Sequence, residues 1–253
     1  MEDVYIKIIL FIFGSMIGSF LGCMGFRIPN KIKTSYPNSY CPYCKKELKW
    51  YMNIPIFSYI FLRGKCAYCK KSIGIIYFFT EVLCAILFVI NYTLFSFSLN
   101  FYIATILSCM FIVTIVSDFL YYYISDRVIL LGILSLIIVL FIFLKIDVLK
   151  NILFAVLMFI IMYLIKLIGN YILKKESLGD GDIKLMGVIC LAVGLINSFL
   201  TLFIASISGL IFSLFIRNKN KEGIIPFGPF LLFGSLVTLY FNEYIVDIIN
   251  KLI

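Results

Sequence analysis

Residues 99–121 read LNFYIATILSCMFIVTIVSDFLY, and this stretch decides the fold class. A helix needs about 20 apolar residues to cross the hydrocarbon core of a bilayer. The run has that length and contains one charged residue, Asp118. An ionisable group at membrane depth is expensive unless it is paired or solvated, so its presence requires a reason. The stretch therefore predicts a membrane-spanning helix with a special acidic side chain near one face.

Similar apolar runs recur along the whole chain. Of its 253 residues 63% are hydrophobic and 14% are charged, which excludes a water-soluble protein with a single core. We predict an all-α polytopic membrane protein with about eight transmembrane helices, in which the last long apolar block is broken around Asn197. The expected spans are 5–26, 75–95, 99–121, 128–145, 150–173, 184–197, 199–216 and 227–245.

The basic residues predict the orientation. The segment 27–74 holds ten of the 22 Lys and Arg residues, and such residues collect in cytoplasmic loops. With eight spans both termini then lie outside the cytoplasm, and the chain divides into a first transmembrane helix (1–26), a cytoplasmic loop (27–74) and a membrane core (75–253). The charges flank apolar spans and form no groove, so the net charge of +9 indicates contact with anionic lipids and no nucleic-acid partner.

Four cysteines of the cytoplasmic loop predict a metal site. The sequences CPYC and CAYC place Cys41 with Cys44 and Cys66 with Cys69. Two such pairs supply the four sulfurs of a structural, tetrahedral zinc site with no open position for catalysis. Two alternatives remain: disulfides, which the reducing side of the membrane disfavours, and a thioredoxin-like redox pair, which normally adjoins a strand and a helix.

The chain contains no histidine, which excludes Ser-His-Asp and Cys-His catalysis. Asp118 and Asp182 both fall at the cytoplasmic ends of predicted spans. Two close carboxyl groups share one proton, so one acts as a base on water and the other as an acid. Gly179 and Gly181 allow a sharp turn and a close approach beside Asp182. The alternatives are an interfacial role for Asp118 and a helix amino-cap for the Gly-x-Gly-Asp turn.

Two further ionisable residues fall within predicted spans. Glu81 either pairs with a basic residue across the bundle or lines a substrate or cofactor cavity, and Lys166 lies close enough to a helix end to extend its ammonium group to the interface. A relay of Glu81, Asp118 and Lys166 would instead indicate a proton-coupled transporter.

In order along the chain, these motifs resemble the prepilin peptidases, or type IV leader peptidases. The resemblance covers nearly the whole chain. It rests on GSFL at 18–21 with RIP at 27–29, the two cysteine pairs, TEV at 80–82, Asp118 with ISD at 124–126, GDGDIKL at 179–185 and PFGPFL at 226–231. The chain departs from the family pattern at Gly22, where Asn is usual, and at Ser125, where Pro is usual.

The resemblance implies a multi-pass aspartyl endopeptidase of the bacterial cytoplasmic (inner) membrane, with its active site facing the cytoplasm. It implies that Asp118 and Asp182 are catalytic and that Lys184 and Asp126 support them. Its partners would be prepilins and pseudopilins, whose basic leader is removed after a glycine. Many members also methylate the new amino terminus with S-adenosylmethionine; Glu81 is the candidate residue on the cofactor side. Presenilin-type proteases share Gly-x-Gly-Asp but lack the cysteine loop.

Overall fold

A computed structural model describes residues 2–33, 38–144, 148–216 and 225–242, and these residues form helices with no β-strand. In the cysteine loop lie a 3-10 helix and one short α-helix, η1 (Trp50–Asn53) and α2 (Phe57–Phe61). The other helices are α1 (Glu2–Arg27), α3 (Ile75–Phe95), α4 (Leu99–Tyr121), α5 (Asp126–Leu144), α6 (Val148–Leu173), α7 (Asp180–Val193), α8 (Leu195–Ile216) and α9 (Gly228–Tyr240).

The eight expected spans match eight of these helices, but only six of them are long and apolar enough to cross a membrane. The other two, α7 and α9, have 14 and 13 residues. The expected break near Asn197 lies at Gly194, whose φ of 82° is a conformation that glycine adopts without strain. Residues 243–245 of the last expected span lie outside the described residues.

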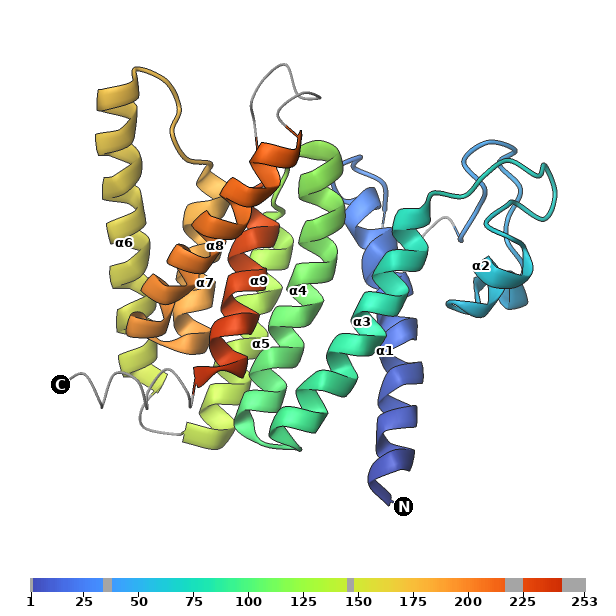
Figure 1. Cartoon of the computed structure of the whole chain (residues 1–253), viewed down its shortest axis with the longest axis horizontal. Coiled ribbons are helices and arrows are strands. Elements are labelled where there is room, and N and C mark those ends of the chain that lie inside the picture. Colours follow the sequence, from blue (N-terminus) through green and yellow to red (C-terminus); the bar gives the residue numbers. More distant parts are fainter. Residues whose placement is uncertain (1, 34–37, 145–147, 217–224, 243–253) are drawn as a thin grey trace.

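Consecutive long helices run antiparallel across the molecule. Figure 1 shows the amino terminus at the end of the bundle opposite the cysteine loop, and each long helix reverses the direction of the one before. The end of α4 therefore lies at the same side of the bundle as the starts of α5, α7 and α9. This arrangement brings residues that are far apart in sequence to one face.

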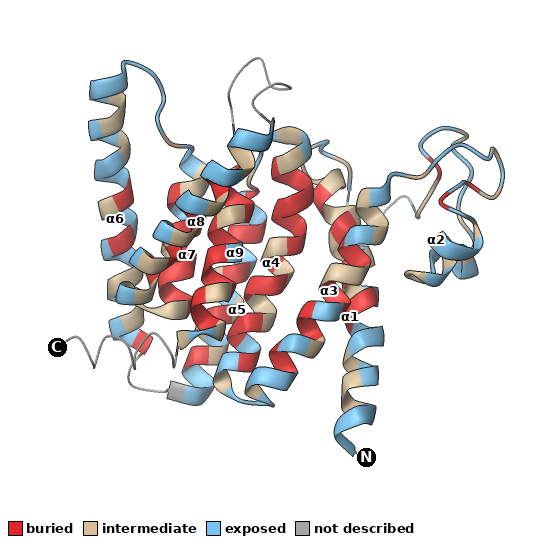
Figure 2. Ribbon diagram, viewed as in Figure 1, coloured by how far each residue is buried: buried red, intermediate tan, exposed pale blue. Residues whose placement is uncertain are grey.

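Helix α4 lies at the centre of the bundle. In its most apolar window 72% of residues are buried, against 11% in α6, and Figure 2 shows the buried residues concentrated on α4, α7 and α9. The outer faces of α5, α6 and α8 expose large apolar side chains, which only lipid can cover favourably. The chain is therefore a multi-pass membrane protein.

Glycines on α1 bring this helix close to α3. A Cβ atom on Gly18 would lie 2.7 Å from the carbonyl oxygen of Thr80, and one on Gly22 would lie 2.5 Å from the Thr80 hydroxyl oxygen. The two backbones can approach this closely only because these positions lack side chains. Gly22, which stands where the family pattern usually has Asn, thus allows the close packing of α1 against α3.

Candidate functional site

Asp118 lies near the end of α4, and its side chain is almost fully enclosed, with 5% of the residue exposed. Its Oδ2 atom accepts a hydrogen bond from the backbone N–H of Gly228 over 3.1 Å. Gly228 is the first residue of α9, and a helix amino terminus carries partial positive charge. The contact therefore favours a negative charge on this carboxyl group.

The PFGP segment explains how α9 comes so close to Asp118. A Cβ atom on Gly228 would lie 2.7 Å from Cδ1 of Ile124, 3.0 Å from Cγ2 of Thr114 and 3.1 Å from Oδ2 of Asp118. No larger residue fits between these three groups. The next residue, Pro229, stands in the first turn of the helix, where its missing N–H leaves no backbone bond unmade.

Asp182 lies in the first turn of α7, which Gly179 precedes as the amino-cap residue. Its backbone N–H donates to the Gly179 carbonyl oxygen over 3.2 Å. Its Oδ1 atom is buried and accepts no hydrogen bond from any part of the chain that the structure describes. The two carboxyl groups, 64 positions apart in sequence, are close enough for the charge of Asp118 to act on Asp182.

Ile124 packs between the two motifs that carry these aspartates. A Cβ atom on Gly181 would lie 2.8 Å from Cβ of Ile124, and the same side chain covers Gly228 from the other side. Ile124 thus packs against glycines of two separate helices, Gly181 of α7 and Gly228 of α9. In the sequence, Ile124 is marked only by its place at the start of the ISD motif, two positions before Asp126.

An ion pair links the starts of α5 and α7. Lys184 donates from Nζ to Oδ1 of Asp126 over 2.6 Å, and both side chains are partly exposed. Ser125 caps α5, because its Oγ accepts from the backbone N–H of Arg127 over 3.3 Å. The serine that replaces the usual proline therefore satisfies a backbone donor that a proline side chain would leave free.

The positive charge of Lys166 is neutralised by acidic residues other than Asp118 and Asp182. Its Nζ lies 2.6 Å from Oδ1 of Asp180 and 3.0 Å from Oε1 of Glu176, and the ammonium beside Asp180 holds the pKa of that carboxyl below its usual value. In the described residues, Glu81, Asp118 and Lys166 each have different partners. They form no chain of hydrogen bonds of the kind that a proton relay needs.

Glu81 accepts a hydrogen bond from the backbone of the cysteine loop. Its Oε2 atom accepts from the backbone N–H of Ile56 over 2.6 Å, and its side chain also interacts with Ser19. No ion pair to a basic residue is found for it among the described residues. Glu81 therefore holds the cysteine loop against α1 and α3.

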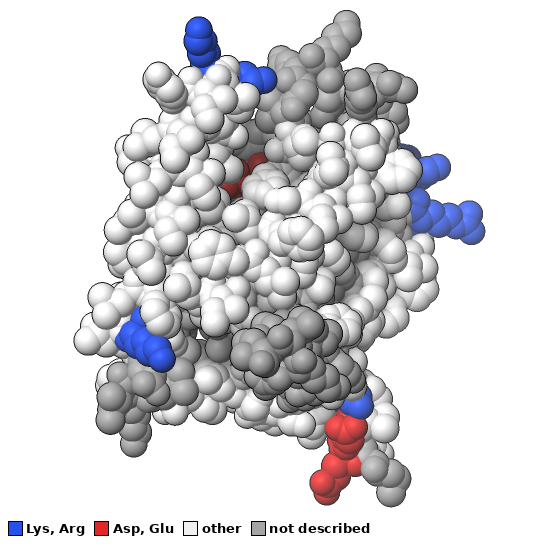
Figure 3. Space-filling view, turned by 60° about the vertical axis from the view of Figure 1, so that its left-hand side comes forward, with Lys and Arg blue, Asp and Glu red and all other residues white. Residues whose placement is uncertain are grey.

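Surface charge is sparse on the flank of the bundle. Figure 3 shows acidic side chains at the bottom of a recess, surrounded by uncharged surface, while most basic side chains stand at the edges of the molecule. A recess with acidic groups at its floor suits a substrate that carries positive charge.

The four loop cysteines come together as expected. The Sγ atoms of Cys41 and Cys69 lie 3.8 Å apart, those of Cys44 and Cys66 lie 4.0 Å apart, and all four sulfurs fall within 4.8 Å of one another. All four are free thiols. Backbone N–H groups of Cys69 and Tyr68 lower the pKa of the Cys66 thiol to about 6, and a thiolate is the form that binds metal. The cluster fits a tetrahedral metal ion.

The two cysteine pairs sit on two copies of one turn. In the first copy the N–H of Cys41 donates to the Lys46 carbonyl oxygen, and in the second the N–H of Cys66 donates to that of Lys71. The Lys46 ammonium lies 5.3 Å from the ring centre of Tyr68, and that of Lys71 lies 4.7 Å from the ring centre of Tyr43, so each copy contacts the other. The repeat CxYCKK at 41–46 and 66–71 is the sequence signal of this symmetry, which was not among the predicted features.

Comparison with known families gives two matches that follow one another. The Bacterial Peptidase A24 N-terminal domain matches residues 12–95, and the Type IV leader peptidase family matches residues 105–214. The first covers the cysteine loop and α3, and the second covers both aspartates.

Known proteins similar to this chain align along most of its length. A prepilin leader peptidase/N-methyltransferase of Bacillus subtilis is 28% identical, over 96% of this chain and 98% of the relative. A type 4 prepilin-like proteins leader peptide-processing enzyme of Escherichia coli O78:H11 is 30% identical, over 90% of this chain and 91% of the relative. No solved structure matches the chain significantly.

Proposed function

Since the chain belongs to the type IV leader peptidase family, we propose that it is a membrane aspartyl endopeptidase that removes the basic leader of prepilins and pseudopilins. We place its active site at the cytoplasmic face of the bacterial inner membrane. The observation that carries the proposal is the approach of Asp118 to Asp182 at one end of the bundle, from helices remote in sequence.

The chemistry follows from a proton shared by two carboxyl groups. One carboxylate takes a proton from water as the water oxygen attacks the carbonyl carbon of the scissile bond, and the other carboxyl group protonates the departing amine. The Gly228 N–H favours negative charge on Asp118, while Oδ1 of Asp182 lacks a donor among the described residues. We therefore assign the base to Asp118 and the proton to Asp182 before the reaction.

The position of the pair suits a substrate that is itself a membrane helix. A prepilin has a basic leader followed by an apolar helix, so lateral entry from the bilayer leaves its scissile bond near the interface. The recess with an acidic floor would accept the basic segment. Glu176 and Asp180 contribute little to this attraction because Lys166 already pairs with both.

We assign zinc to the four loop cysteines as a structural ion. Sulfur ligands at this spacing suit zinc, and four protein ligands leave no position for water or substrate. Lys45, Lys46, Lys70 and Lys71 adjoin the sulfurs in sequence and compensate the negative charge of such a centre. The ion takes no part in peptide cleavage.

Methylation of the new amino terminus is proposed from the names of relatives, several of which include N-methyltransferase. S-adenosylmethionine would supply the methyl group. Glu81 remains the candidate residue on the cofactor side; its Oε2 atom accepts from the Ile56 N–H and its side chain interacts with Ser19, which leaves further acceptor positions on the carboxylate.

The decisive experiment compares Asp118→Asn and Asp182→Asn with the matched control Asp180→Asn, using purified protein and a prepilin-like substrate. Either dyad variant should lose cleavage by at least about a thousandfold, with folding and zinc content unchanged. Asp180→Asn should retain cleavage, because Asp180 is exposed and pairs with Lys166. Full activity of Asp118→Asn would overturn the assignment, and mass spectrometry of the products locates the cut after a glycine or within the apolar helix.

A further inference from the structure

The cysteine loop exposes an apolar surface that the metal site does not explain. Trp50 is 79% exposed and Phe61 is 81% exposed. Several large apolar neighbours on η1 and α2 are also exposed: Tyr51, Ile54, Phe57 and Ile60. A contiguous patch of this kind, defined here as the aromatic patch, is unfavourable in water and marks a contact surface.

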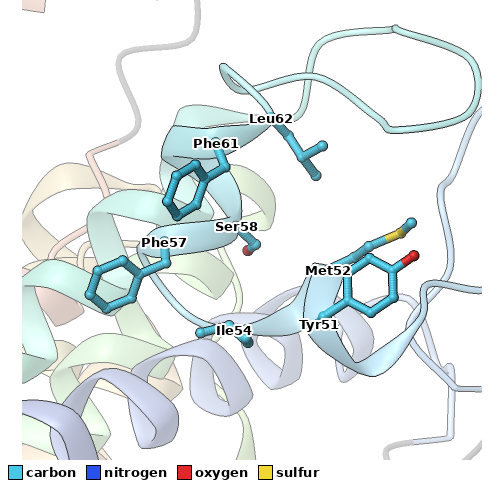
Figure 4. Close-up of a pocket in the computed structure, with 7 residues that line it drawn as sticks. All are labelled: Tyr51, Met52, Ile54, Phe57, Ser58, Phe61 and Leu62. Carbon is cyan, nitrogen blue, oxygen red and sulfur yellow. The ribbon is translucent and has the colours of Figure 1, made fainter.

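A cleft opens within the aromatic patch. It has a volume of about 220 Å³ between η1 and α2 and is lined by Tyr51, Met52, Ile54, Phe57, Ser58, Phe61 and Leu62. Figure 4 shows Phe57 and Phe61, one helical turn apart, projecting on the same side of α2. The lining has no charged side chain and few polar atoms, so the cleft suits a hydrocarbon chain.

The hydrogen bond between Ile56 and Glu81 fixes the depth of the patch. Glu81 lies six residues into α3, which begins at Ile75, and six residues of helix correspond to about 9 Å. Ile56 immediately precedes α2 and donates to Glu81 over 2.6 Å. Helices that lie flat on a membrane bury their apolar face about 5–10 Å into the boundary between headgroups and acyl chains. With the membrane surface taken at the start of α3, the tether holds α2 at this depth.

The surrounding charges complement an anionic leaflet. Lys49 precedes η1, and Arg63 and Lys65 follow α2; all three are exposed. Basic residues beside exposed aromatic ones are typical of a membrane-surface segment. Figure 1 shows α2 on the opposite side of α1 and α3 from α7 and α9. That position faces surrounding lipid and is remote from the end of the bundle where the dyad receives its substrate.

We propose that the aromatic patch inserts into the cytoplasmic leaflet and that its cleft takes a lipid acyl chain. The cysteine loop is then anchored to the membrane at three places: the end of α1, the start of α3 and the aromatic patch between them. The proposal rests on Trp50, Ile56 and their neighbours and is independent of the peptidase activity.

Trp50 is the only tryptophan of the chain and therefore reports its own surroundings by fluorescence. The intact protein is reconstituted in vesicles of phosphatidylcholine and phosphatidylglycerol, with or without lipids brominated near the start of the acyl chains. Brominated lipid should reduce Trp50 emission about twofold or more, and aqueous acrylamide should quench it weakly. Strong quenching by acrylamide with none by brominated lipid would overturn the proposal.

A second tryptophan position provides the matched control. In the Trp50→Phe background, Tyr43→Trp places the probe on the cysteine turn, where Tyr43 is 59% exposed. This probe should show the opposite pattern, with strong acrylamide quenching and little effect of brominated lipid. The variant Phe57→Glu with Phe61→Glu should restore acrylamide access to Trp50 while zinc content stays unchanged. Emission that responds to added prepilin peptide but not to brominated lipid would assign the patch to substrate and overturn the lipid proposal.

Discussion

The aspartate site and the cysteine site are built in opposite ways. At the aspartate site, Asp118 and the Gly228 N–H that contacts it are 110 positions apart, and the contact exists only when α4, α5, α7 and α9 are packed together. At the cysteine site, the four sulfurs lie within 28 positions of one another, on two hydrogen-bonded turns that form locally.

Because the two sites are stabilised by different contacts, loss of one should leave the other intact. The helices around the dyad bury a continuous apolar core, whereas the described part of the loop buries few side chains apart from Cys41 and Cys66. We therefore expect the loop to depend on a metal for folding, as small metal-binding domains generally do, and the core to be independent of it.

Apart from the aspartates themselves, the largest effect on the aspartate site is expected from Gly181→Val. Its side chain would collide with Ile124, since even a Cβ atom would lie 2.8 Å from Cβ of that residue. A displacement of about 1 Å at a catalytic group reduces a rate about a hundredfold, so cleavage should fall at least that far while zinc is retained.

The control for that change is Gly187→Ala on the same helix, where a Cβ atom meets only ordinary contacts at 3.7 Å. It should leave cleavage unchanged. Removing the obstacle with Ile124→Gly, which lacks the Cβ atom, in the Gly181→Ala background should recover part of the activity lost by Gly181→Ala alone. Failure of this rescue would show that Ile124 does not couple the two motifs.

Removal of the metal should have a large effect confined to the loop. In Cys41→Ser with Cys66→Ser, zinc should fall from about one per chain to none, because two ligands cannot hold a tetrahedral ion. Trypsin should then cut rapidly among the basic residues of 45–71, while α3 to α9 stay protected. If the melting temperature of the whole protein collapsed with the metal, the two sites would form one cooperative unit.

An intermediate effect is expected where the two regions meet. Glu81→Ala leaves the N–H of Ile56 without its charged acceptor, a loss of about 1.5–3 kcal/mol. Hydrogen exchange at Ile56 should accelerate at least about tenfold, and Glu81→Gln, which keeps an acceptor oxygen, should fall between this variant and the native protein. Thr93→Ala, on an exposed part of α3, is the control. Unchanged exchange in Glu81→Ala would remove the tether.

The smallest effect should come from the ion pair between Asp126 and Lys184. Both side chains are partly exposed, and exposed pairs contribute about 0–1 kcal/mol. Lys184→Met should therefore lower cleavage less than about fivefold. Exchanging the charges with Asp126→Lys and Lys184→Asp should restore most of it, as measured by initial rates. A loss as large as that of Asp118→Asn would show a direct part in the reaction.

Much of the fold could be predicted from the sequence because apolar runs set helix positions directly. The spans 75–95 and 99–121 coincide with α3 and α4, and the four cysteines meet because their spacing encodes the turns that hold them. The break at Gly194 was misplaced at Asn197, since both residues interrupt an apolar run and only the backbone conformation distinguishes them.

The contacts of the aspartate site could not be predicted in the same way. The family motifs named Asp118, Asp182 and the PFGP segment, but no local pattern states that the Gly228 N–H donates to Asp118 or that Ile124 separates two glycines. Glu81 was expected to pair with a basic side chain or to line a cavity, and no local pattern states that it accepts from a backbone N–H of the loop. Such pairings depend on the packing of helices that are distant in sequence.

The shortness of α7 and α9 affects how water, the second reactant of a hydrolysis, reaches the site. At 1.5 Å per residue these helices are about 20 Å long, which is roughly 10 Å less than the thickness of the hydrocarbon core of the bilayer. Both begin beside the dyad, and the surface is hollowed above acidic groups in Figure 3. We therefore expect water to approach the aspartates from the end of the bundle where α7 and α9 begin, although Asp118 itself is almost fully enclosed.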